Sequence, residues 1–98
     1  EKKLGTLIVR NKKNYTTGII TDGQVRRFNS KSLNLNFLKV KDVMTRNPIK
    51  VDKDILATKA LAIMNEKKIT SLCVYENKKK FITIGILHIH NILNKKIY

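Results

Sequence analysis

The sequence predicts an α+β fold made from two copies of one small unit, and three observations support this prediction. In residues 18–27 an apolar run ending in Thr-Asp-Gly leads into a short amphipathic segment, which is typical of a buried strand followed directly by a helix. Residues 85–93 repeat the same plan. The apolar tetrapeptides 6–9 and 71–74 also match, and the second copy has a hairpin loop that is two residues longer.

Length and amino-acid composition indicate a small globular protein. With 98 residues and 42% hydrophobic content, the chain has room for one compact domain or two very small interlocked ones. The single cysteine, Cys73, lies in an apolar run without a disulfide partner, so we interpret it as a core residue. Because no secretory signal or long apolar span is recognisable, we expect a cytoplasmic protein with no membrane partner.

The charge balance favours anionic partners. Lys and Arg number 21 against 7 Asp and Glu, which gives a formal net charge of +14. However, the lysine clusters at residues 12–13, 78–80 and 95–96 fall in expected turns and a helix end, where they are typical of solvated charge. Nucleic-acid binding is therefore kept only as a third hypothesis.

The first half is expected to contain two strands and a short helix. The strands are predicted at residues 4–9 and 15–21, with a polar turn at 10–14 between them. Thr21 or Asp22 is expected to cap the helix, which ends near residues 29–30. A linker at residues 30–37 follows, and its apolar side chains are expected to pack onto the core: Leu33, Leu35 and Phe37.

The second half is expected to read strand, helix, strand, strand, helix. One helical turn at residues 39–44 comes before it, and Asp52 or Asp54 is expected to cap the first full helix. The apolar positions of that helix follow a helical period: Ala57, Ala60, Leu61 and Met64. The three strands are predicted at residues 49–51, 69–75 and 81–87, and the closing helix carries Ile89, Ile92, Leu93 and Ile97.

Aligning the two halves pairs Gly18 with Gly85, Thr21 with His88, and Gln24 with Asn91. The first copy then lacks its leading strand and helix. We therefore predict a partial first repeat plus linker at residues 1–37 and a complete second repeat at 38–98.

This pattern resembles the CBS (cystathionine beta-synthase) domain, which has this order of elements and usually occurs as a pair. The second copy carries the resemblance in Val-Met-Thr at residues 43–45, Pro-Ile at 48–49, Ile-Thr-Ser-Leu at 69–72 and Gly-Ile-Leu-His at 85–88. Together with Thr-Asp-Gly-Gln-Val-Arg-Arg at residues 21–27 and Lys-Asp-Val-Met-Thr at 41–45, these motifs look like the C-terminal CBS tail of bacterial D-arabinose 5-phosphate isomerases.

The resemblance implies a regulatory module that binds a nucleotide or nucleotide-sugar in a cleft between the repeats. The implied partners are a second copy in a homodimer, an attached sugar-isomerase domain, and a phosphorylated small molecule. Where CBS nucleotide sites usually place Asp, this chain has Gln24 and Asn91, so the carboxylate that typically grips a ribose is missing.

The candidate ligand-binding residues gather at two places. The first is the helix start after the strand at residues 15–21, where free N–H groups and an arginine suit a phosphate or carboxylate. The second is the equivalent junction with the strand edge beside it. The full candidate set is Thr21, Asp22, Gly23, Gln24, Arg27, Ile49, Lys50, Thr70, Ser71, His88 and Asn91. A plain capped helix and ordinary strand-edge hydrogen bonding are the structural alternatives.

No catalytic machinery is recognisable. A nucleophile, a base and an orienting group do not occur together, so no catalytic residue or cofactor is assigned and the chain alone is not expected to be an enzyme. His88 and His90 lack an evident third ligand, so no metal site is assigned. A purely structural dimerisation tail is the main alternative to the regulatory module.

Overall fold

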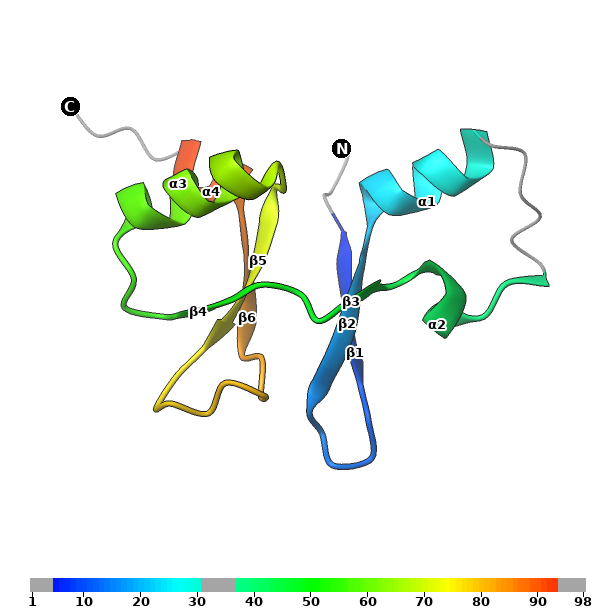
Figure 1. The fold of residues 1–98 in the computed structure, drawn as a ribbon, viewed down its shortest axis with the longest axis horizontal. Coiled ribbons are helices and arrows are strands. Elements are labelled where there is room, and N and C mark those ends of the chain that lie inside the picture. The colour runs from blue at the N-terminus through cyan, green and yellow to red at the C-terminus, as the bar shows by residue number, and fades with distance from the viewer. Residues whose placement is uncertain (1–4, 31–36, 94–98) are drawn as a thin grey trace. The chain divides into compact units, whose positions relative to one another are not determined.

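The computed structural model describes residues 5–30 and 37–93, with side chains in the first range described up to Arg27 (Figure 1). The chain divides into two compact units, Glu1–Pro48 and Ile49–Tyr98. Each unit contains its own three-stranded sheet.

Unit 1 has an antiparallel sheet in the order β1-β2-β3, formed by β1 (Thr6–Arg10), β2 (Thr16–Thr21) and β3 (Thr45–Arg46). The side chain of Asn11 accepts hydrogen bonds from the amides of Lys13 and Tyr15, which closes the tight turn between β1 and β2. Helix α1 (Asp22–Ser30) continues directly from the end of β2, and the short helix α2 (Val40–Val43) comes before β3 (Figure 1).

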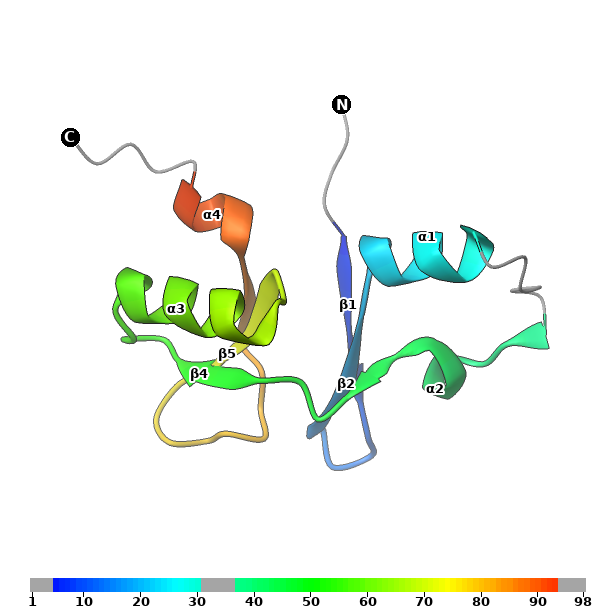
Figure 2. The same ribbon diagram turned by 45° about the horizontal axis from the view of Figure 1, so that its top comes forward.

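Unit 2 contains β4 (Lys50–Asp52), α3 (Ala57–Lys67), β5 (Ser71–Tyr75), β6 (Gly85–His88) and α4 (Ile89–Leu93). Strand β5 lies in the centre, parallel to β4 and antiparallel to β6. Figure 2 shows the two helices as neighbours. The core is a cluster of side chains from β4, α3 and β5: Val51, Ala60, Met64 and Leu72.

The registers of the two hairpins confirm the predicted internal repeat. Val9 pairs with Gly18 in unit 1, and Val74 pairs with Gly85 in unit 2. At the other end of each hairpin, Thr6 pairs with Thr21 and Ser71 pairs with His88. The four paired positions of one hairpin, from Thr6–Thr21 to Val9–Gly18, therefore correspond to the four paired positions of the other, from Ser71–His88 to Val74–Gly85.

The two sheets differ in what flanks the hairpin. In unit 2, β5 has β4 on its outer side, and Leu72 is completely buried beneath α3. In unit 1, β1 is an edge strand, and the equivalent residue Leu7 is 66% exposed. Within the described residues, unit 1 has no counterpart of the β4–α3 pair.

Several predictions about individual elements were wrong. Neither Asp52 nor Asp54 caps α3, because the carboxylate of Asp52 accepts a hydrogen bond from the amide of Asp54 and the N-cap residue is Leu56. The last strand begins at Gly85, and residues 81–84 are irregular. Phe37 is 83% exposed, so it does not pack onto the core.

Other predictions fall partly outside the described residues, namely those for Leu33, Leu35 and Ile97. Strand β3 was not predicted; it pairs only Thr45 and Arg46 with β2. The α2–β3 segment follows the predicted repeat boundary at residues 37 and 38, yet β3 belongs to the sheet of unit 1.

Candidate functional site

The first corner, residues 21–27, is the junction of β2 and α1, and a reciprocal pair of hydrogen bonds closes it. The amide of Gln24 donates to Oγ1 of Thr21 (3.3 Å), and the amide of Thr21 donates to Oε1 of Gln24 (2.8 Å). This arrangement is a capping box, which satisfies backbone donors at a helix start. Thr21 is thus the cap of α1, as one of the two alternatives predicted.

Two other predicted ligand residues at the first corner also have partners inside unit 1. Nε2 of Gln24 donates to the carbonyl of Val43 (3.4 Å) and to Oγ1 of Thr45. The carboxylate of Asp22 accepts from the amide of Gly5 (2.9 Å), which ties the helix start to the beginning of β1. The side chains of Gln24 and Asp22 therefore hold the corner together.

Gly23 and Arg27 form the more open part of the first corner. A Cβ on Gly23 would lie 3.5 Å from Nη1 of Arg27, so the guanidinium group folds back over the first turn of α1. The positive end of the helix dipole lies at this turn. The arrangement places two sources of positive potential together, which suits an anionic group.

The second corner, residues 88–93, is the junction of β6 and α4, and it repeats the bonding of the first. The amide of His88 donates to Oδ1 of Asn91 at 2.8 Å, as Thr21 does to Gln24. The amide of Ile89 donates to the carbonyl of Thr70 at 2.8 Å, and the amide of Asp22 donates to that of Gly5 at 3.2 Å. The two corners therefore share these two hydrogen bonds as well as their sequence pattern.

The two histidines pack against each other. Their ring centroids lie 4.9 Å apart with 12° between the planes, and the amide of His90 donates to Nδ1 of His88 at 3.1 Å. This bond makes Nδ1 of His88 an acceptor, which leaves Nε2 as the protonated nitrogen of the neutral ring. Across residues 5–30 and 37–93, no group of three or more His, Cys, Asp or Glu side chains is placed to hold a metal ion.

One face of the unit 2 sheet carries three of the predicted residues. Ser71 lies opposite His88 on the β5–β6 ladder, and Lys50 lies opposite Cys73 on the β4–β5 ladder. Because side chains alternate along a strand, Lys50, Ser71 and His88 project from the same face. This face is opposite to the one on which Leu72 packs against α3.

Ser71 is the most unusual of these residues. It is only 7% exposed, and its Oγ has no hydrogen-bond partner among the residues that the structure describes. A buried hydroxyl without a partner costs free energy that a ligand would recover by bonding to it. Thr70 beside it is exposed, whereas Ile49 is half-buried and its carbonyl accepts from the amide of Cys73 at 3.0 Å.

Two further contacts define the chemistry of this face. Nζ of Lys50 lies 5.3 Å from the ring centroid of Phe81, within the range of a cation–π interaction. Cys73 is fully buried, as predicted. Burial raises the pKa of the Cys73 thiol, and the hydrogen bond with Thr83 and the charge of Lys50 offset only part of this effect. The thiol is therefore a poor nucleophile.

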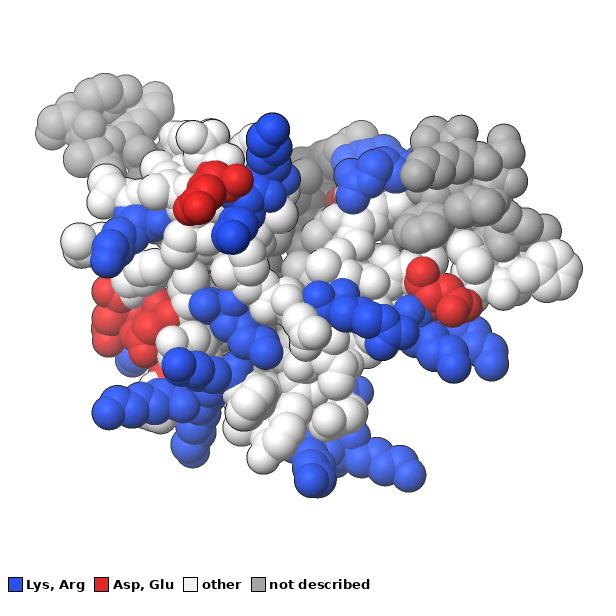
Figure 3. Space-filling model, viewed as in Figure 1, with Lys and Arg blue, Asp and Glu red and all other residues white. Residues whose placement is uncertain are grey.

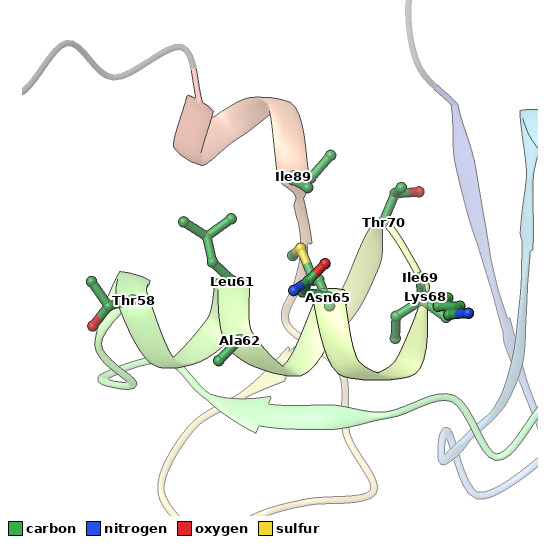
Figure 4. A pocket seen from close by; sticks show the side chains of 9 residues that line it. Thr58, Leu61, Ala62, Asn65, Lys68, Ile69, Thr70 and Ile89 are labelled. Carbon is green, nitrogen blue, oxygen red and sulfur yellow. The ribbon is translucent and has the colours of Figure 1, made fainter.

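A groove that sequence reasoning missed, except for Thr70, lies between α3 and the start of α4. Its volume is about 620 Å³, and Figure 4 shows Leu61 projecting from α3 toward the side on which Ile89 lies. The residues that line it are Thr58, Leu61, Ala62, Met64, Asn65, Lys68, Ile69, Thr70 and Ile89. The available signal was the second uncharged stripe of the helix, which includes Thr58, Ala62 and Asn65.

On the face drawn in Figure 3, the Lys and Arg side chains of the described residues do not form one basic patch. Figure 3 shows Lys and Arg side chains dispersed around the visible face, over several elements. In the described part of the chain, no helix has the length and apolar character needed to cross a membrane.

A family model and the relatives of known sequence can be compared with this chain. The family model for the CBS domain matches residues 40–97. The arabinose 5-phosphate isomerase KdsD of Yersinia pestis is 37% identical over 92 residues, which are 94% of this chain and 27% of that enzyme. The KdsD protein of Escherichia coli K12 is 35% identical over the same shares. The chain thus spans about a quarter of the length of these relatives.

Solved structures show the same fold. The CBS domain pair of protein MJ0100, in complex with 5-methylthioadenosine and S-adenosyl-L-methionine, has a TM-score of 0.76 at 20% identity and covers 91% of this chain and 67% of its own. The CBS domain protein PAE2072 of Pyrobaculum aerophilum, complexed with AMP, has a TM-score of 0.79 at 16% identity and covers 94% and 69%.

Proposed function

Because the chain belongs to the CBS-domain family, we propose that it is the ligand-sensing regulatory module of a sugar-phosphate isomerase. The relatives support the choice of enzyme, since this chain is 35–37% identical to part of the KdsD proteins of Yersinia pestis and Escherichia coli K12. Interconversion of arabinose 5-phosphate and ribulose 5-phosphate would then belong to an attached catalytic domain. The module would act on that domain by binding a ligand with different affinity in two arrangements of the protein.

The observation that carries the proposal is the unpartnered hydroxyl of Ser71, on the same sheet face as Lys50 and His88. A hydroxyl, a cation and an imidazole together suit a ligand that has both hydrogen-bonding and anionic groups. Two solved relatives of similar fold are complexes with adenosine compounds. We therefore infer that the ligand is a nucleotide or a nucleotide-sugar.

The proposed contacts divide into two kinds. Gly23 and Arg27 at the first corner would receive a phosphate or another anionic group. Gln24 and Asn91 would position their corners, because their side-chain oxygens already accept bonds from the caps. The remaining proposed contacts are Thr21, Asp22, Ile49, Lys50, Thr70, Ser71 and His88.

Thermal unfolding in the presence of ligand tests this proposal. AMP, S-adenosylmethionine and a cytidylyl-sugar would each be titrated to millimolar concentration. A ligand at ten times its Kd adds about 1.4 kcal/mol, which raises the Tm of a chain of this size by roughly 6–10 °C. Arg27→Gln should reduce the shift, whereas Arg26→Gln serves as the matched control at the neighbouring position. A Tm unchanged by all three compounds would remove the sensing role.

A second candidate function, dimerisation, is favoured by the groove between α3 and α4. In a chain with 28 charged residues, this side of α3 presents Thr58, Leu61, Ala62 and Asn65, all uncharged. Leu93 on α4 is 59% exposed. Small and apolar residues at this spacing suit packing against a helix of a second copy.

Light scattering of purified protein tests the dimer. Leu61→Lys should shift the mass from dimer to monomer, whereas Lys59→Glu on the same helix, outside the groove, should leave the mass unchanged. A wild-type protein that remains monomeric at concentrations near 1 mM, the weak end of specific association, would overturn this function.

A further inference from the structure

We propose that Met44 is a redox-modification site, at which a peroxide converts the thioether to the sulfoxide and the sulfoxide releases β3 from the edge of β2. This inference goes beyond ligand sensing and does not depend on it. It rests on where the sulfur atoms of the two methionines and the single cysteine lie, and on what Sδ of Met44 contacts.

The three sulfur-containing side chains differ in accessibility. Met64 is 1% exposed in the core of unit 2, and Cys73 on β5 is completely buried. Met44 is half-buried and follows α2 as its C-cap residue. Because the oxidant must reach the sulfur atom, a dissolved peroxide is expected to react first at Met44.

Sδ of Met44 packs against the backbone of β2 at Gly18. A Cβ on Gly18 would lie 2.6 Å from Sδ, 2.8 Å from the carbonyl oxygen of Thr45 and 3.0 Å from Cγ of Met44. The thioether therefore fits only because residue 18 has no side chain. An unbranched, adaptable methionine suits such a narrow gap.

The sulfoxide does not fit this contact. An added oxygen that points toward Gly18 enters a space that is already too small for a methyl group. There it meets the carbonyl oxygen of Thr45, which is also an acceptor, so the two cannot form a hydrogen bond. An oxygen that points away makes an apolar contact polar. Both orientations weaken the attachment of Met44 to β2.

Strand β3 has little else to hold it in place. Thr45 and Arg46 pair with β2 but are both exposed, so their side chains add little apolar burial. Figure 1 shows α2 leading directly into this strand, where it crosses β2. Two paired residues form a small unit of local stability, so loss of the contact at Met44 is expected to open β3 without unfolding the β1–β2 hairpin.

The opening of β3 extends to the first corner through Gln24. Its Nε2 donates to the carbonyl of Val43 and to Oγ1 of Thr45, the residues on either side of Met44. Both acceptors move away when the segment leaves. The capping bonds between Gln24 and Thr21 lie within the corner and are kept. Oxidation at Met44 therefore frees the amide of Gln24 and leaves the start of α1 intact.

The chemical step balances with a hydroperoxide as the oxidant. A lone pair of Sδ attacks the outer peroxide oxygen, and the S–O bond forms as the O–O bond breaks. The departing alkoxide takes the hydroxyl proton and leaves as an alcohol, or as water when the oxidant is hydrogen peroxide. Sulfur loses two electrons and the peroxide gains them. Methionine sulfoxide reductases reverse the change, so the site can be reset.

Hydrogen peroxide added to the folded chain tests the proposal. Peptide mass spectrometry would follow the gain of oxygen at Met44, Met64 and Cys73. We expect Met44 to be converted at least about tenfold faster than the two buried residues. NMR would follow amide hydrogen exchange at Ile19 and Thr45, which lie opposite each other on β2 and β3. Both amides should exchange at least about tenfold faster after oxidation, while the amides of β5 keep their protection.

Three variants make the result specific. Met44→Leu keeps an apolar side chain that peroxide does not oxidise, so treatment should leave its amide exchange unchanged. Met64→Leu is the matched control, because it retains Met44 and should respond as the wild type does. Met44→Gln places a polar group at the same point and should open β3 without peroxide. A methionine sulfoxide reductase should restore slow exchange in the oxidised wild type.

Three results would overturn the proposal. The first is oxidation of Met64 or Cys73 as fast as Met44 in the folded chain. The second is a Met44 sulfoxide that leaves the exchange at Thr45 unchanged, and the third is a response of Met44→Leu equal to that of the wild type. None of these measurements uses a nucleotide, so their outcome is separate from that of the ligand titrations.

Discussion

Truncating two equivalent leucines should have very different consequences for the two units. Leu7 and Leu72 occupy the same place in their hairpins, opposite Ile20 and Leu87. Leu72 is fully buried in the core with Val51 and Met64, whereas Leu7 is 66% exposed. Leu72→Ala should therefore destabilise its unit severely, and Leu7→Ala should not.

The structure sets the sizes of the two effects. Removing a fully buried leucine side chain costs about 3–5 kcal/mol, because lost transfer free energy is added to the cost of the cavity. At Leu7 only about a third of the side chain is shielded, so the loss should stay below about 1 kcal/mol. With a denaturant dependence near 1 kcal/mol/M for a small unit, Leu72→Ala should lower the urea midpoint by at least about 3 M, or leave the unit unfolded without urea if its stability is smaller than the loss.

Urea titration followed by NMR separates the units, because the amides of Gly18 and Gly85 report on one each. Leu72→Met, which keeps the volume, should cost less than about 1.5 kcal/mol and controls for the chemical change. Equal losses for Leu7→Ala and Leu72→Ala would refute the reasoning, since Leu7 would then be covered as Leu72 is.

Three further predictions concern single positions. Thr21→Ala should cost about 1 kcal/mol in urea unfolding by removing the cap of α1, whereas Thr21→Ser should keep most of it; equal losses would contradict the capping box. Gly18→Ala should cost about 1–3 kcal/mol because its Cβ clashes with β3, whereas Gly85→Ala should cost nothing measurable; the reverse order in thermal unfolding would be inconsistent with the two environments. Burial raises the pKa of the Cys73 thiol, so its contribution to stability is complete below the unfolded-state pKa and is lost as pH rises through the folded-state pKa. Unfolding free energy should therefore fall in alkaline solution more steeply in the wild type than in Cys73→Ala, and parallel curves would contradict this.

The local pattern of the sequence was enough to predict the hairpins, both strand-to-helix junctions and the repeat. Apolar periodicity and glycine placement are local signals, and each junction contains both. The cap of α3 was mispredicted because Asp52 bonds to Asp54 within a turn, a competition that composition alone does not decide. Strand β3 was missed because only two residues pair, and their partner strand lies far away in the sequence.

In the candidate site, too, the features set by local sequence were predicted, and those set by packing of distant segments were not. The sequence located both corners, and it even contained the capping-box pattern Thr-x-x-Gln at residues 21–24. It did not indicate that Ser71 would be buried without a hydrogen-bond partner, because that depends on how strands from distant parts of the chain are packed. The uncharged stripe of α3 was a signal for the groove, but the groove itself also depends on Ile89, which lies far away in the sequence.

The capping bonds bear directly on what the module can recognise. The side-chain oxygens of Gln24 and Asn91 already accept hydrogen bonds from the amides of Thr21 and His88. An acceptor for ribose hydroxyls must therefore come from another residue. The contacts that we propose at the corners and on the unit 2 face include donors and cations: Arg27, Lys50 and the Ser71 hydroxyl. Such a set discriminates by phosphate or carboxylate more than by sugar. We therefore expect Gln24→Asp to strengthen binding of an adenine nucleotide in calorimetry while leaving inorganic phosphate unchanged, and a loss of binding for both would contradict this division of roles.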